Sequence, residues 1–84
     1  MREKTVEFKG THYTLKDLPM VVNRLKYRKE KLAEMRAEGM PKILIDNEIR
    51  LVLEAHLLGS MIIDKFTDKD CKAEIRLLKA LLKA

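Results

Sequence analysis

The chain has 84 residues, a formal net charge of +5 and a pI near 9.5. Its hydrophobic content of 46% excludes an intrinsically disordered protein, and its length fits one domain over residues 1–84. One cysteine and two histidines exclude an intrachain disulfide and are too few for a structural zinc site, so we expect neither a metal nor a cofactor. Because a domain this short has a marginal core, association with a partner is the remaining way to enlarge it.

The apolar residues are not gathered into a membrane segment. The most apolar stretch, Leu51–Ile63, is interrupted by Glu54 and His56 and is shorter than the roughly 20 residues that span a bilayer. The first nine residues contain no apolar run of the kind found in signal peptides. We therefore predict a cytoplasmic protein that does not contact a membrane.

Residues 5–15 alternate apolar and polar side chains on either side of Lys9 and Gly10. This pattern predicts a short β-hairpin with these two residues as its loop. The expected cross-strand pairs are Val6 with Tyr13, Glu7 with His12, and Phe8 with Thr11. One side of this hairpin is apolar. Because two strands alone are marginal in water, that side packs on the helices, or the hairpin adds its edge to another chain.

Two possible starts compete for the first helix. Thr14 and Asp17 form a capping-box pattern, but a helix that begins there places Pro19 where it removes a hydrogen bond. A later start keeps Pro19 in the first turn, so we predict a helix over 17–38 with Gly39 as its C-terminal cap. Its apolar positions are Leu18, Val21, Val22, Leu25, Leu32 and Met35.

The second and third helices complete the predicted fold. Apolar residues cover roughly half of the circumference of a helix over 42–66, so this helix has more than one neighbour and lies at the centre. The short linker before it favours an antiparallel pair with the first helix. Thr67 and Asp70 form another capping-box pattern, which predicts a third helix over 67–84. The expected fold is mainly α (α+β), with a short N-terminal β-hairpin followed by a three-helix bundle.

Two rows of cationic side chains are the clearest positional signal. Spacings of three and four residues place each row on one side of its helix. The first helix carries Arg24, Arg28 and Lys31, and the third carries Lys72, Arg76, Lys79 and Lys83. Such rows contact phosphates in nucleic-acid-binding proteins, where an aromatic residue such as Tyr27 can stack on an unpaired base. Alternatively, the rows are ordinary solvated faces or meet an acidic protein surface.

A helix-turn-helix arrangement would place the second helix in a DNA groove. This helix begins Lys42-Ile-Leu-Ile-Asp-Asn-Glu48, which is too apolar and too acidic for a recognition helix. Any contact with nucleic acid is therefore expected from the third helix, or from the hairpin around Lys9.

No group of residues in the sequence indicates catalysis. Glu48 and His56 are polar residues in the apolar part of the second helix, but the eight residues between them separate their Cα atoms by about 12 Å. We expect Glu48 to pair with a basic residue such as Arg28, and His56 to bond a backbone group or Ser60. We therefore predict that the protein is not an enzyme and has no small-molecule substrate.

Cys71 lies in the first turn of the predicted third helix. A helix N-terminus can lower the pKa of a thiol, which is one condition for a reactive cysteine. The residue shares a helix face with Ile75 and Leu78, however, and this position favours an inert core cysteine.

The third helix has more apolar surface than one neighbouring helix can cover. Its apolar face is widened by two pairs of leucines, Leu77 with Leu78 and Leu81 with Leu82. We expect this surface to bind a partner, and the size of the core favours a homo-oligomer or a second protein. The leading hypothesis is a non-catalytic regulatory or inhibitory protein that binds a macromolecule through this surface. The alternative is a basic nucleic-acid-binding accessory protein that contacts phosphates through the first and third helices.

Overall fold

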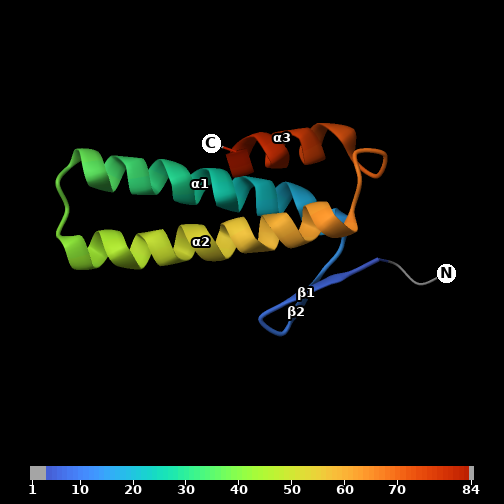
Figure 1. Cartoon of the computed structure of the whole chain (residues 1–84), viewed down its shortest axis with the longest axis horizontal. Coiled ribbons are helices and arrows are strands. Elements are labelled where there is room, and N and C mark those ends of the chain that lie inside the picture. The colour runs from blue at the N-terminus through green and yellow to red at the C-terminus, as the bar shows by residue number, and fades with distance from the viewer. Residues whose placement is uncertain (1–3, 84) are drawn as a thin grey trace.

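The computed structural model describes residues 4–83 and consists of a β-hairpin followed by three helices (Figure 1). This architecture confirms the predicted fold class, which is mainly α with a small β part. The elements are β1 (Val6–Phe8), β2 (Thr11–Tyr13), a 3₁₀ turn (Leu15–Asp17), α1 (Leu18–Ala37), α2 (Lys42–Lys65) and α3 (Lys72–Lys83).

The hairpin has the predicted register, with Val6 opposite Tyr13 and Phe8 opposite Thr11. Its two loop residues, Lys9 and Gly10, have φ angles of 50° and 79°. Two successive residues with positive φ twist a two-residue loop in the sense that the strands require. Val6 and Tyr13 are buried in the core, so the apolar side of the hairpin packs on the helices.

The two competing starts of the first helix both form, one after the other along the chain. The Thr14 hydroxyl accepts a hydrogen bond from the Lys16 N–H at 3.3 Å, and the Asp17 carboxylate accepts one from the Thr14 N–H at 2.9 Å. This capping box closes the 3₁₀ turn, and α1 begins immediately after it at Leu18. Pro19 therefore lies in the first turn of α1, where its missing N–H is not needed.

Gly39 ends the first helix, as the sequence predicts. Its φ of 68° is accessible to glycine without strain, and its N–H donates to the Arg36 carbonyl at 3.2 Å. The Met40 N–H donates to the Met35 carbonyl at 3.1 Å, which completes a Schellman cap. The chain reverses at this point, so α1 and α2 run antiparallel side by side (Figure 1).

The third helix begins five residues later than predicted, at Lys72 instead of residue 67. One of the two capping-box bonds forms: the Thr67 N–H donates to the Asp70 carboxylate at 2.6 Å, but the Asp70 N–H donates to the Thr67 main-chain carbonyl at 2.9 Å and not to its hydroxyl. These bonds close one isolated turn. The helix starts after it, with the hydrogen bond from the Ile75 N–H to the Cys71 carbonyl at 3.0 Å.

The second helix contacts α1, α3 and β1, and α1 contacts α2, α3 and the 3₁₀ turn, so the two long helices share the core. Gly59 allows α3 to approach closely, since a Cβ atom there would lie 3.0 Å from Leu78 Cδ1. The hairpin packs on another side of α2, near Leu51 and Ala55. The fully buried side chains at the centre of the molecule are Leu18, Val21, Leu25, Leu58, Ile62, Ile75 and Leu78.

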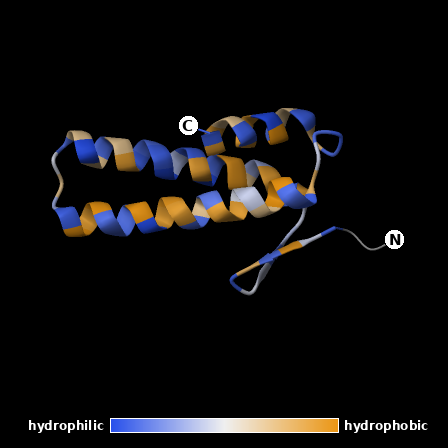
Figure 2. Cartoon of the chain, in the orientation of Figure 1, coloured by the Kyte–Doolittle hydropathy of each residue, from blue (hydrophilic) through white to orange (hydrophobic). Residues whose placement is uncertain are grey.

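The two long helices extend beyond the rest of the molecule. α2 has 24 residues and α3 has 12, so their axes measure about 36 Å and about 18 Å. α3 covers the half of the α1–α2 pair that includes the C-terminal part of α2 (Figure 1). The other half is only two helices thick, and Figure 2 shows hydrophobic residues along α2 throughout its length.

Adjacent leucines of α3 provide a test of this packing. Leu78 is 0% exposed and Leu77 is 46% exposed. We expect Leu78→Ala to lower the free energy of unfolding by about 2–5 kcal/mol, since it leaves a cavity beside Gly59. Leu77→Ala should cost less than about 1 kcal/mol. Urea denaturation of the two variants checks this, and equal losses would contradict the described packing of α3.

Candidate interaction surfaces

Among residues 4–83, the most exposed aliphatic side chains lie on α2. Ile43, Leu53 and Leu57 are 77%, 62% and 54% exposed, and Ile49 is partly exposed. At 100° per residue, Leu53 and Leu57 project from the side of α2 opposite the buried residues Ala55 and Ile62. We call Ile43, Ile49, Leu53 and Leu57 the outer face of α2. No described element covers these side chains.

The predicted partner surface on α3 requires a correction. Leu78 is part of the core, and Leu81 and Leu82 are partly buried against it. Of the four leucines named for this surface, Leu77 is the one with a largely exposed side chain. The physical reason is that α3 packs on both α1 and α2, so two helices cover its wide apolar arc. The exposed apolar surface lies on α2 instead.

The sequence analysis did not identify the outer face of α2, although the positions of two of its leucines indicate it. Leu53 and Leu57 lie on the side of α2 that also carries the polar residues Asp46, Arg50 and Asp64. Two leucines within a polar face, one turn apart, indicate an additional contact surface.

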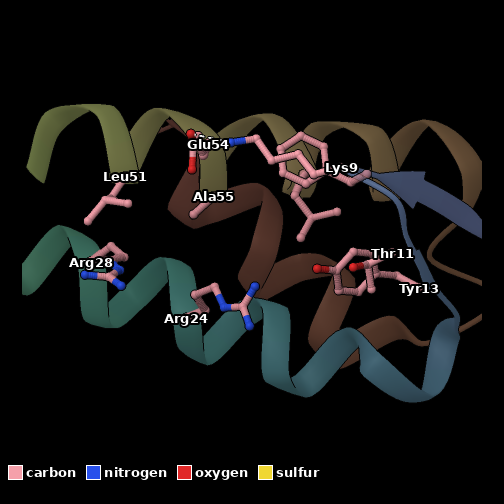
Figure 3. Close-up of a pocket in the computed structure, with 10 residues that line it drawn as sticks. Lys9, Thr11, Tyr13, Arg24, Arg28, Leu51, Glu54 and Ala55 are labelled. Carbon is pink, nitrogen blue, oxygen red and sulfur yellow. Dashed lines mark hydrogen bonds and ion pairs between the residues drawn. The ribbon is translucent and has the colours of Figure 1, made fainter. Parts of the chain in front are cut away.

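The structure does not bring the two cationic rows together. Lys72, Arg76 and Lys83 are exposed on α3, where Lys79 pairs with Asp68 at 3.0 Å. On α1, Lys31 is exposed, while Arg24 and Arg28 line a cleft beneath the hairpin (Figure 3). In that view α3 lies behind α1 and α2, on the far side from the hairpin. The rows therefore form two separate surfaces.

Glu48 is buried, and its partner is the one expected from the sequence. Arg28 Nη1 donates to Glu48 Oε1 at 3.2 Å, and the Arg28 guanidinium also lies 5.6 Å from the centre of the Tyr27 ring. A buried carboxylate needs such a cation, because removing it would leave an uncompensated charge. The pair therefore has a structural role between α1 and α2.

His56 bonds a backbone group, as the sequence analysis anticipated. Its Nε2 atom lies 3.1 Å from the Leu82 carbonyl oxygen, and Lys29 Nζ donates to the Leu81 carbonyl. Side chains from α2 and α1 thus satisfy carbonyls in the last turn of α3, where helices lack intrahelical donors. His56 and Glu48 do not converge on a common site, because each is committed to a different contact.

Cys71 is not an activated thiol. Its Sγ donates a hydrogen bond to Glu74 Oε2 at 2.6 Å, and this bond, together with burial, raises the pKa of the thiol above its ordinary value. The same bond lowers the pKa of the Glu74 carboxyl. The Glu74 contact therefore opposes any activation by the helix N-terminus, and the thiolate is disfavoured near neutral pH.

Comparison of the chain with protein-family models, with curated proteins and with solved structures found no match. Within residues 4–83, no three His, Cys, Asp or Glu side chains are grouped so that they could hold a metal ion. In the same range, no helix combines the length and the apolar character needed to cross a bilayer. Inferences about function therefore start from the geometry of the surfaces.

The contact between Cys71 and Glu74 predicts the reactivity of the thiol. At pH 8, Glu74→Ala should increase the rate of alkylation by iodoacetamide, since loss of the hydrogen bond returns the thiol pKa toward its ordinary value and raises the thiolate fraction. Arg76→Ala, on the same helix, is the control. A rate unchanged by Glu74→Ala would show that the carboxylate does not hold the thiol proton.

Proposed function

We propose that this protein is a non-catalytic regulatory or inhibitory interaction protein that binds a macromolecular partner, and itself, through a helical surface. The outer face of α2 supports this proposal, because it exposes Leu53 and Leu57 on an element that is otherwise central to the fold. Burying a leucine contributes about 1.5–3 kcal/mol, so a partner that covers both gains substantial binding free energy. Association also enlarges a small core.

A second copy of the chain is the partner that this face fits best. In an antiparallel pairing of two α2 helices about a two-fold axis at Leu53, Ile49 lies opposite Leu57 of the second copy. The same register places Lys42 opposite Asp64 of the second copy, so unlike charges meet at both ends of the contact. A two-fold contact of this kind uses one patch twice and closes as a dimer.

Charge reversal at the outer face tests this proposal. The wild type should form a concentration-dependent dimer in sedimentation velocity, and Leu53→Lys should raise the dimer dissociation constant at least about tenfold because two ammonium groups would meet at the axis. Leu77→Lys places the same charge on an exposed leucine of α3 and should leave the constant unchanged. A wild type that stays monomeric at millimolar concentration would contradict self-association.

The register has its own test by cross-linking. In a Cys71→Ser background, Leu53→Cys places two thiols next to each other at the axis, so air oxidation should give a disulfide-linked dimer. Ile43→Cys is also exposed but lies far from the axis and should stay largely monomeric. Equal cross-linking of the two variants would argue against the antiparallel register.

The row on α3 favours a second candidate function, a basic nucleic-acid-binding accessory protein. Lys72, Arg76 and Lys83 are exposed and carry no ion pair within the described residues. Fluorescence anisotropy with mixed DNA and RNA at 50 and 200 mM salt tests it, because phosphate contacts make affinity fall steeply with salt. Absence of binding at 50 mM salt would remove this candidate.

The proposed location is the cytoplasm. The single cysteine holds its proton in a hydrogen bond to Glu74 and forms no disulfide among the described residues, which suits a reducing compartment.

A further inference from the structure

A cleft of about 310 Å³ lies between the loop end of the hairpin and the two long helices (Figure 3). Its floor includes Leu51 and Ala55 of α2, and the hairpin contributes the rings of Phe8 and Tyr13 to its walls. Two guanidinium groups, Arg24 and Arg28, line it from α1. The cleft thus combines a cationic wall with an aliphatic floor and aromatic walls.

The charges in the cleft are unequally compensated. Lys9 pairs with Glu54 at 2.5 Å, and Arg28 pairs with Glu48 at 3.2 Å. Arg24 has no carboxylate partner in residues 4–83, and its recorded contact is with Met20 Sδ at 3.9 Å. Among residues 4–83, one positive charge in the cleft therefore has no carboxylate counter-ion.

The hydrogen-bond donors in the cleft are also incompletely used. A guanidinium has five N–H groups, so Arg28 keeps donors after its bond to Glu48. Figure 3 shows Arg24 extending along the cleft toward the side where Tyr13 lies. Within residues 4–83 the Tyr13 hydroxyl makes no hydrogen bond to a protein group, and it can donate to an anion.

We propose that this cleft binds a small organic anion, with its phosphate or carboxylate group at Arg24 and its apolar or aromatic body over Leu51 and Ala55. Guanidinium groups bind both kinds of oxyanion in a bidentate manner, and Arg24 is exposed at the mouth of the cleft, where a ligand can reach it. The volume suits a molecule of the size of a nucleoside monophosphate. The sequence predicts no small-molecule substrate for this protein. The anion proposed here is a bound ligand, and the protein does not convert it.

The Lys9–Glu54 pair holds the rim of this cleft together. It joins the loop of the hairpin to α2, and the hydrogen bond from Lys9 lowers the pKa of the Glu54 carboxyl. With Lys9 and Glu54 paired to each other, Arg24 remains the group with an uncompensated charge for a ligand. The cleft lies on a different side of α2 from Leu53, so anion binding and self-association are independent proposals.

The test is calorimetric titration of the full chain with adenosine 5′-monophosphate, phenylacetate, inorganic phosphate and adenosine. One of the two organic anions should bind more tightly than inorganic phosphate, and uncharged adenosine should not bind. Arg24→Gln should weaken the organic anion about tenfold or more, because a charge-assisted contact is lost. Lys31→Gln removes an exposed charge of the same helix outside the cleft and should leave affinity unchanged.

The arms of the titration separate the outcomes. Tighter binding of the monophosphate or of phenylacetate identifies the acid group that the cleft takes. Failure of all probes at 10 mM, or equal weakening by Arg24→Gln and Lys31→Gln, would overturn the site. Equal affinity for inorganic phosphate and the organic anions would overturn the part of the proposal that assigns the apolar body to Leu51 and Ala55. Leu53→Lys should bind the same anion as the wild type, so failure of self-association would leave this result intact.

Discussion

The difference in length between α2 and α3 is the constraint on which the rest of this structure depends. A 12-residue helix covers only part of a 24-residue helix, so the chain completes a three-helix core at one end and leaves two helices at the other. Buried leucines, isoleucines and valines concentrate where three helices meet. The outer face of α2 lies on the opposite side of that helix from the core and runs through both parts of the pair, so it is apolar surface that residues 4–83 of one chain do not bury.

Polar side-chain contacts lie near the place where the three-helix part of the molecule meets the two-helix part. Where α3 ends, His56 and Lys29 bond its last carbonyls, so each long helix contributes a side chain to the end of the short one. The ion pair of Arg28 with Glu48 lies between α1 and α2, at positions where a bundle helix would carry leucine. Such a charge pair contributes little net stability but specifies which faces of the two helices meet. Arg24, one turn away, faces the hairpin side with no acid partner in residues 4–83.

Local features of the fold could be predicted from the sequence because local chemistry determines them. The hairpin register follows from Lys9-Gly10, and the end of α1 follows from Gly39. The capping-box pattern at Thr67 shows the limit of such reasoning, since the Asp70 carboxylate bonds the Thr67 N–H as expected but these residues close a single turn ahead of α3. The burial of Leu78 and the exposure of Leu53 depend on which side of each helix a neighbouring element covers. A helical wheel gives the direction of a side chain but not the presence of a neighbour.

Amide hydrogen exchange of α2, followed at increasing protein concentration, tests the central claim most directly. If the outer face is covered by a second copy, amides of residues 42–57 should exchange progressively more slowly as the dimer forms, since a partner that binds the folded state suppresses local opening. Amides of the hairpin should be much less affected. Exchange rates in α2 that are the same at micromolar and millimolar protein would contradict the account and leave this face as ordinary solvent-exposed surface.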